Sequence, residues 1–441
     1  MAPDVLAILM IAGVFALLVL GMPIGFAMGV AGLAGMWAMM GPEIALPSIT
    51  NLAMSKLASY LWTTIPLFIL MGHFALQSGV VRDLFALMAR WLWRLPGGLA
   101  VATSASAAAF AACSGSSLAT VATMGRLAIG EMRARGYDMR LAAGCVAACG
   151  TMGSLIPPSI YLIVYAMFTE QSITQMFMAG IIPGLLEFLI YSSMIIFICW
   201  RYPSLAPRIH HRQAALLGAM TGADRPRPSR ALLLLGLGVM VLSGIYTGFF
   251  TPTEAGAVGA FAAFLLALTM RGLTWKRLNH ALLDTAEATV SIFTIVLGAM
   301  ILSRALGLTG LPAELSAMIS NSGLPPMAII IGFCVMYIIL GMFLDPMGMV
   351  LLTLPVVFPV VMQLGYDPIW FGIIMIKVME IGLITPPLGL NVYMLRASSP
   401  GLKLGTINRG VGWFFCADIF HLALLLAFPA LSTWLPRMMA P

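Results

Sequence analysis

The chain has 441 residues, of which 61% are hydrophobic and 9% charged, a composition that excludes an ordinary soluble domain. Its six cysteines form no CxxC pair and its five histidines lack metal-ligand spacing, so we expect neither a disulfide framework nor a structural metal site. The net charge of +7 would suggest nucleic acid in a soluble protein, but the basic residues stand at the ends of apolar runs, so membrane topology accounts for them.

Apolar runs long enough to cross a bilayer recur along the whole chain. They include residues 5–22, 24–40, 57–76, 173–199, 231–250, 254–270, 287–303 and 410–434. The first run has no basic residues before it and no clear cleavage site after it, so we expect a retained span and not a signal peptide. The sequence therefore predicts an all-α polytopic protein embedded in a lipid bilayer.

Two short motifs indicate that the chain contains a duplicated unit. The tripeptide Gly-Tyr-Asp at 136–138 precedes a Pro-Pro pair at 157–158, and the same tripeptide at 365–367 precedes a second pair at 386–387. Both motifs are displaced by 229 residues (365 − 136 and 386 − 157). Because a bias in composition would not keep one register over this distance, we predict an internal repeat.

Positive charge predicts the orientation of the two repeats, residues 1–200 and 230–441. The connection at 126–140 is rich in arginine, whereas its counterpart at 359–368 has neither Lys nor Arg. Lys and Arg are retained on the cytoplasmic side of a membrane, so equivalent connections face opposite sides and the repeats have inverted topology. We place the polar linker 201–229 in the cytoplasm and both termini in the periplasm.

The same charge pattern predicts a re-entrant hairpin in each repeat. Residues of about 97–130 would begin and end on one side of the membrane, with the tip at 113–117. The displacement of 229 residues predicts a second hairpin over about 326–359 and makes Ser116 equivalent to Asp345.

Each Pro-Pro pair interrupts a further apolar span. The interrupted spans cover about 139–168 and 369–396. Since proline has no N–H donor, the first pair should free the carbonyls of Gly153 and Ser154, and the second those of Gly382 and Leu383. One such break is more often a packing kink, but two at equivalent positions favour a functional role.

Oxygen atoms freed in this way would suit sodium ions. Hydroxyl and carboxylate groups that would complete the two sites are those of Ser114, Ser116 and Ser117, and of Asp345, Thr385 and Asn391. Thr385 should cap a half-helix that begins at Pro386, with its positive end at the membrane midplane. Helix ends of this kind would attract an anion.

Six motifs carry a family resemblance: GMPIGFAMG, ACSGSSLATVATMG, GSLIPPS, FTPTEAGAVGA, LDPMGMVLLTLPVVFP and EIGLITPPLGLN. With them the chain resembles the large membrane (M) subunit of tripartite ATP-independent periplasmic (TRAP) transporters. The resemblance implies an elevator-type, sodium-coupled importer of an organic anion, a carboxylate or sugar acid, in the bacterial inner membrane. It also implies a separate small membrane (Q) subunit and a periplasmic binding protein as partners.

By motif, the resemblance and the freed carbonyls together predict two sets of sodium ligands. The first set is Ser114, Gly115, Ser116, Ser117, Gly153, Ser154 and Pro157. The second set is Asp345, Gly382, Thr385, Pro386 and Asn391.

Three residues beside the breaks are candidates for contact with the substrate. Lys377 and Glu380 lie three residues apart on one predicted helix and would form an ion pair within the membrane. Lys377 would then attract a substrate carboxylate while Glu380 tunes it, or the two would form a structural pair, which we favour. Ser159, directly after the first Pro-Pro pair, is the third candidate.

Several other polar residues could have either a functional or a purely structural role. The segment TPTE at 251–254 resembles a binding site but also satisfies a helix capping box, the interpretation we favour. His73 could relay a proton, although a lone histidine is more often bound to a neighbouring carbonyl or hydroxyl. Glu187 lies near the predicted outer end of its span, where it would meet lipid headgroups.

Three other functions compete with uptake by a tripartite system. An intramembrane hydrolase would use a serine of SGSS as nucleophile and His73 as base, but the equivalent second tip offers Asp345 and no serine. A stand-alone dicarboxylate or citrate-type sodium symporter would work without a binding protein. A passive channel would not need the two symmetric states that paired inverted hairpins supply.

Overall fold

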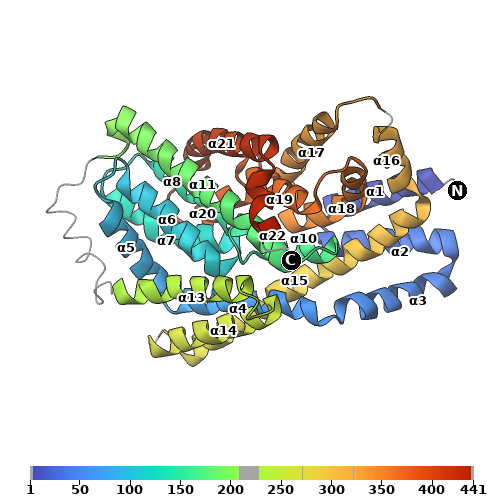
Figure 1. The fold of residues 1–441 in the computed structure, drawn as a ribbon, viewed down its shortest axis with the longest axis horizontal. Coiled ribbons are helices and arrows are strands. Elements are labelled where there is room, and N and C mark those ends of the chain that lie inside the picture. Colours follow the sequence, from blue (N-terminus) through green and yellow to red (C-terminus); the bar gives the residue numbers. More distant parts are fainter. Residues whose placement is uncertain (1–2, 208–227, 271, 321, 439–441) are drawn as a thin grey trace.

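The computed structural model describes residues 3–207, 228–270, 272–320 and 322–438, and the regular structure within these ranges is entirely helical (Figure 1). By length and composition, seven of the described helical segments can cross a membrane: Met139–Phe168, Ile173–Arg201, Ser229–Tyr246, Pro252–Thr269, Trp275–Thr309, Pro346–Gln363 and Leu404–Ala427. The predicted all-α polytopic fold is confirmed. Residues 208–227, most of the predicted linker, lie outside the described residues.

Residues 3–207 contain the α-helices α1 (Pro3–Val19), α2 (Ile24–Met40), α3 (Pro42–Leu52), α4 (Thr64–Gln77), α5 (Val80–Leu92), α6 (Gly98–Ser114), α7 (Ser117–Ala134), α8 (Met139–Cys149), α9 (Met152–Leu155), α10 (Ile160–Phe168) and α11 (Ile173–Arg201). The second half supplies α13 (Pro228–Tyr246), α14 (Pro252–Thr269), α15 (Trp275–Thr309), α16 (Leu311–Ser320), α17 (Pro326–Gly341), α18 (Pro346–Gln363), α19 (Pro368–Ile384), α20 (Leu390–Ser398), α21 (Leu404–Ala427) and α22 (Ala430–Met438).

Several helix starts keep the displacement found in the sequence. Helix α7 begins at Ser117 and α18 at Pro346, and α8 begins at Met139 and α19 at Pro368, so both pairs differ by 229 residues (346 − 117 and 368 − 139). One pair of equivalent segments differs in shape. The segments Pro42–Leu57 and Tyr60–Gln77 are bent by 64°, whereas their counterpart α15 is one helix of 35 residues. The inverted orientation of the repeats stays a prediction.

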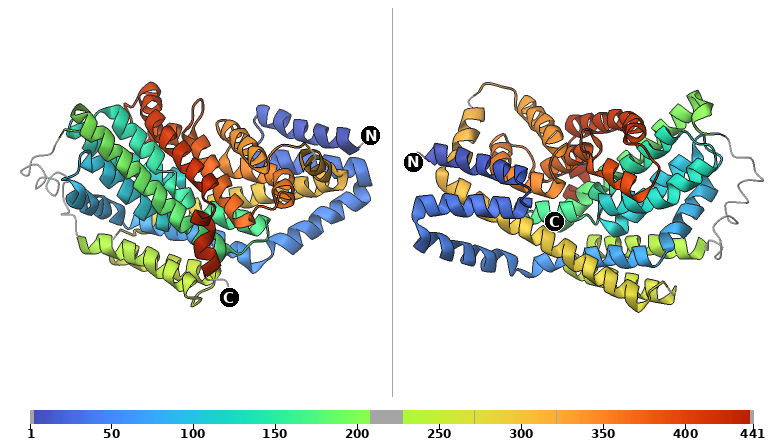
Figure 2. Two further views of the ribbon diagram at one scale, coloured as in Figure 1. Left: turned by 45° about the horizontal axis from the view of Figure 1, so that its top comes forward. Right: turned by 180° about the vertical axis from the view of Figure 1, so that it is seen from behind.

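Long helices connect the two ends of the molecule. Helix α15 packs along α2 and also contacts α4 and α18, and α14 packs along α4. Figures 1 and 2 show α5 to α8 gathered at one end of the molecule and α1 to α3 at the other, with α15 crossing between them. The hairpins α6–α7 and α17–α18 pack against α8 and α19 respectively.

Both hairpins turn at the residues that the sequence predicts. In the first, Gly115 has the left-handed conformation (φ 59°), which glycine adopts at little cost, and the Ser116 hydroxyl accepts from Ala119 N at 3.4 Å. In the second, the Asp345 carboxylate accepts from Gly348 N at 3.1 Å. The equivalent residues Ser116 and Asp345 therefore both cap the second helix of their hairpin.

Candidate functional site

Both hairpin tips open onto a single cavity of about 300 Å³. Ser114, Gly115 and Ser116 line it from the first tip, and Asp345 and Met347 line it from the second. Helices α4, α6, α7, α10 and α15 provide the remaining walls. Folding thus brings two equivalent segments, which the sequence separates by more than half its length, to one cavity.

The first tip and the first break approach each other through their backbones. A Cβ atom added to Gly115 would lie 2.7 Å from the carbonyl oxygen of Pro158, and one added to Gly153 would lie 2.8 Å from that of Ser116. A side chain larger than hydrogen would separate the two segments. The residues of the first predicted sodium site therefore lie together, and Pro157 lies within the same buried break. Both Pro-Pro peptide bonds are cis.

The hydroxyl groups of this region are partly unpaired. Ser117 Oγ and Ser154 Oγ are buried and make no hydrogen bond within the described part of the chain, while Ser114 Oγ lies 3.2 Å from Thr120 Oγ1. Buried polar groups normally have a partner, so unpaired oxygens beside a cavity favour a bound cation.

One predicted free carbonyl in this break is already bound. The Ser159 hydroxyl donates to the Ser154 carbonyl, so the prediction that this oxygen is free is wrong. Ser159 follows the Pro-Pro pair directly, and its short side chain reaches back across the break. It is fully buried and lies outside the lining of the tip cavity, which its neighbours Ile160 and Tyr161 join instead.

The second break differs from the prediction. Thr385 N donates to Gly382 O at 3.2 Å and Thr385 Oγ1 donates to Ile381 O at 2.5 Å, so Thr385 ends α19. Gly389, with φ 48°, precedes the next helix. The predictions that Thr385 caps a half-helix starting at Pro386 and that the Gly382 carbonyl is free are both wrong, because the polar groups of Thr385 turn back to the preceding turn.

The residues of the second predicted sodium site lie in separate environments. Asn391 is buried, and its Nδ2 donates to Ala147 O on α8 at 3.2 Å, whereas Asp345 is exposed at the tip cavity and Pro386 is exposed as well. The second hairpin instead meets α19 through glycine, because a Cβ added to Gly382 would lie 2.7 Å from Gly341 Cα. Among the described contacts, no hydrogen bond joins Asp345 to Thr385 or Asn391.

Three further polar residues line the cavity wall, and two of them, Tyr161 and Ser291, have no role in the sequence prediction. Tyr161 on α10 and Ser291 on α15 line the cavity, as does His73 on α4. His73 Nδ1 lies 3.9 Å from a carboxylate oxygen of Asp284, and not against the carbonyl or hydroxyl that we expected. The position of Tyr161, three residues after the Pro-Pro pair that interrupts its span, is the sequence signal that would have identified it.

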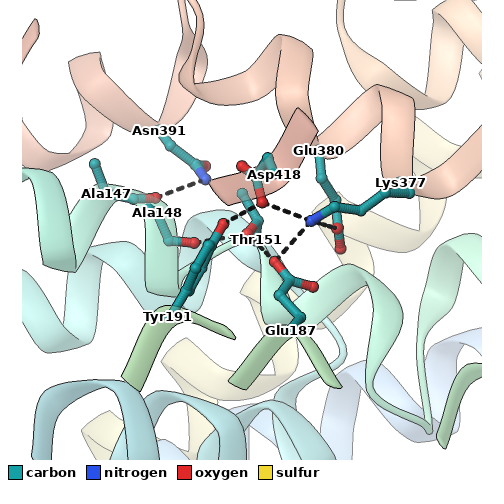
Figure 3. A network of polar contacts seen from close by, with 9 residues as sticks. All are labelled: Ala147, Ala148, Thr151, Glu187, Tyr191, Lys377, Glu380, Asn391 and Asp418. Atoms are coloured by element: carbon teal, nitrogen blue, oxygen red, sulfur yellow. Dashed lines mark hydrogen bonds and ion pairs between the residues drawn. The ribbon is translucent and has the colours of Figure 1, made fainter. Parts of the chain in front are cut away.

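A buried ion cluster encloses the predicted pair of Lys377 and Glu380 (Figure 3). Lys377 Nζ lies 2.7 Å from Asp418 Oδ1, 3.0 Å from Glu187 Oε1 and 3.4 Å from Glu380 Oε2, and all four side chains are fully buried. The Tyr191 hydroxyl donates to Asp418 Oδ1 at 2.6 Å. Helices α11, α19 and α21 meet at this cluster.

The cluster supports one interpretation of the sequence and corrects another prediction. Lys377 is already surrounded by carboxylates and closed off from the tip cavity, so the geometry supports the structural pair for Lys377 and Glu380 over contact with substrate. Glu187 does not meet headgroups, because it is buried and accepts from Thr151 Oγ1 at 3.0 Å. Asp418 was missed, although a single acidic residue in the apolar run 410–434 is an available signal.

The segment TPTE forms the capping box of α14. Glu254 N donates to Thr251 Oγ1 at 3.3 Å, and Thr251 N donates to Glu254 Oε2 at 2.9 Å. The capping interpretation is confirmed.

Comparisons with known proteins match nearly the whole chain to one family of transporters. The family model for the DctM component of tripartite ATP-independent periplasmic transporters matches residues 11–431. The C4-dicarboxylate TRAP transporter large permease protein DctM of Pseudomonas aeruginosa is 38% identical over 384 residues, covering 86% of each chain. The isethionate TRAP transporter permease protein DctMQ of Oleidesulfovibrio alaskensis is 31% identical over 426 residues, covering 96% of this chain and 64% of the relative.

The crystal structure of the YdaH transporter of Alcanivorax borkumensis has a similar fold. Its TM-score is 0.63 at 15% sequence identity, covering 89% of this chain and 90% of that chain. At this identity the likeness supports the fold alone.

Proposed function

The chain belongs to the family of tripartite ATP-independent periplasmic transporters as a DctM component, the large membrane permease subunit, and from this membership we propose that it imports an organic anion together with sodium ions. Its relatives are transporter subunits and not enzymes, which removes the hydrolase alternative. The stand-alone symporter stays the alternative for uptake without a binding protein.

The observation that carries the proposal is the single cavity shared by both hairpin tips. Helices α7 and α18 begin at this cavity, and the positive end of a helix favours an anion. The carboxylate of Asp345 and the unpaired hydroxyls of Ser117 and Ser154 lie at or beside the tips, where oxygen ligands suit sodium. One ion site beside the first break and a second one at Asp345 would link ion binding to the closure of each tip.

The proposed movement is of the elevator type. The hairpins and broken helices would carry the anion and the ions across, while the outer helices, which include α2, α4, α14 and α15, hold still. Inverted repeats supply the two related end states that alternating access needs. In this orientation the linker is cytoplasmic and both termini are periplasmic.

The proposed substrate class and partners follow from the relatives. A relative named for C4-dicarboxylates is 38% identical, so we propose a dicarboxylate or a related organic acid. This chain covers 64% of the DctMQ relative, which fits a separate small membrane subunit as partner. A periplasmic binding protein would complete the tripartite system of the bacterial inner membrane.

Sodium-dependent stability tests the proposal. The purified chain is unfolded thermally in sodium, potassium and choline chlorides at equal ionic strength, as wild type, Asp345→Asn, Asp345→Ala and Ser116→Ala. A bound ion at a hundredfold excess over Kd stabilises by about 2.7 kcal/mol. We expect sodium alone to raise the melting temperature of the wild type, and each variant to blunt this rise.

Asp345→Asn is the matched control for helix capping. Asparagine still caps α18, whereas Asp345→Ala also loses about 1 kcal/mol of capping in every salt. Equal melting temperatures of the wild type in all three salts would contradict sodium coupling, and an Asp345→Asn variant that keeps the full sodium response would remove Asp345 from the site.

A further inference from the structure

A second cavity, of about 480 Å³, adjoins the tip cavity, and Leu76 on α4 lines both. Four arginines from four helices contribute to its wall: Arg82 of α5, Arg126 of α7, Arg230 of α13 and Arg277 of α15. Among the described lining residues, Asp83 is the acidic one. Four guanidinium groups beside one carboxylate leave an excess of positive charge, and a concave surface of one sign concentrates ions of the opposite sign.

A buried hydroxyl adds a second, independent indication of a ligand. Thr123 on α7 lines the same cavity and is 5% exposed. Its Oγ1 has no hydrogen-bond partner within the described part of the chain, although buried hydroxyls normally have one. Arg277 donates one N–H to Gly272 O at 2.7 Å, which leaves other guanidinium donors for a ligand. The cavity therefore combines excess positive charge with hydrogen-bond donors, as an anion site requires.

The two cavities follow one another along a single helix. Ala119 of α7 lines the tip cavity, and Thr123, about one helical turn further on, lines the arginine cavity. The same helix ends at the arginine-rich connection 126–140. An anion that leaves the tips toward this end of the molecule therefore meets the arginine cavity next.

We infer that the arginine cavity is the vestibule through which the transported carboxylate leaves for the cytoplasm. The inference rests on the proposed function, including the orientation that places the connection 126–140 inside. A guanidinium group binds a carboxylate through two parallel N–H···O bonds, so arginine suits this cargo better than lysine would. A lipid phosphate has the same chemistry, and the experiment below separates the two sources.

Cysteine labelling tests the vestibule without requiring transport. Five of the six native cysteines are buried and Cys416 is exposed, so the full-length Cys416→Ser chain is the background. Thr123→Cys places a thiol in the cavity wall. Gly130→Cys is the matched control on the same helix, since a Cβ there meets nothing within 4 Å. The purified chains react with negatively or positively charged methanethiosulfonates, with and without succinate.

The expected result is specific to the cavity. At position 123 the negative reagent should react about tenfold faster than the positive one. Succinate should slow the reaction of the negative reagent severalfold at position 123 and should not slow it at position 130. Arg126→Gln should reduce the preference at position 123, whereas Arg90→Gln, on α5 but outside the cavity lining, should not. In parallel, succinate should raise the melting temperature of the chain with its native Thr123, and Arg126→Gln should reduce this shift.

Two results would overturn the inference. One is equal reaction of both reagents at position 123 without protection by succinate. The other comes from phosphatidylcholine nanodiscs prepared with and without phosphatidylglycerol. If phosphatidylglycerol protects the thiol at position 123 from the reagent and succinate does not, the cavity binds lipid. Equal melting temperatures of the wild type in sodium, potassium and choline chlorides, with succinate protection at position 123 intact, would contradict sodium coupling and leave the vestibule standing.

Discussion

Lys377 joins three helices through one buried ammonium group. Each of the three surrounding carboxylates has an oxygen without a hydrogen-bond partner in the described chain: Glu187 Oε2, Glu380 Oε1 and Asp418 Oδ2. Buried carboxylates are tolerated only when a counter-charge or a hydrogen bond compensates them. Lys377 is therefore the residue on which the packing of α11, α19 and α21 depends most.

Removal of this charge should destabilise the protein strongly. Lys377→Met leaves three carboxylates without their cation, and we expect a loss of about 3–5 kcal/mol in the free energy of unfolding, measured by thermal or denaturant unfolding in detergent. Lys56→Met is the control, because Lys56 forms an exposed pair with Glu170 at 2.9 Å, which is worth about 0–1 kcal/mol. A Lys377→Met chain that folds normally but binds substrate weakly would restore the substrate-contact hypothesis.

At the scale of elements, the hairpin tips depend on local capping and on close backbone contact. The sequence displacement predicts that Ser116 and Asp345 are equivalent residues, and the structure shows that both cap the second helix of their hairpin. The contact between the first tip and the first break needs glycine at position 153, because the Ser116 carbonyl occupies the place of a side chain. A larger residue at position 153 would therefore hold the tip and the break further apart.

Substitution of this glycine should open the first ion site. Gly153→Ala forces a Cβ against backbone, and we expect a loss of about 1–3 kcal/mol in stability together with a weaker sodium-dependent rise in melting temperature. Gly130→Ala on α7 meets nothing within 4 Å and should stabilise its helix by about 0.5–1 kcal/mol with the sodium response intact. If both alanine variants respond to sodium like the wild type, the first tip and break do not form an ion site.

At the scale of the whole molecule, one displacement of 229 residues relates hairpins, breaks and the helices that surround them. The bent segment 42–77 and the straight helix α15 show that the two repeats have diverged in the outer helices. The second helices of the hairpins, α7 and α18, have kept equivalent starts and a capping side chain at the equivalent residue. The hairpin tips that face the cavity have therefore diverged less in their backbone than α4 and α15, which also line it.

Labelling from either side of the membrane tests the inverted topology. Ala134 and Gln363 are the last residues of the equivalent helices α7 and α18, and both are exposed. In a Cys416→Ser background, a membrane-impermeant thiol reagent should reach Ala134→Cys only from the cytoplasm and Gln363→Cys only from the periplasm. Labelling of both from the same side would contradict the inverted repeat.

The sequence by itself determined the features that depend on local composition and on spacing along the chain. Apolar runs indicated the membrane class, the repeated motifs predicted the positions of hairpin tips and breaks, and TPTE predicted its capping box. Apolar runs and the capping box depend on neighbouring residues, and the repeat depends on one fixed spacing, so each pattern can be recognised without knowing which helices pack together.

The tertiary structure alone decided which polar groups meet. The hydrogen bond from Tyr191 to Asp418 joins residues 227 apart in the chain, and that from Asn391 to Ala147 joins residues 244 apart. Propensity and spacing carry no information on such pairs, because helix packing sets them. For the same reason, only the structure showed that Lys377 is enclosed by carboxylates and that four arginines from separate helices line one cavity.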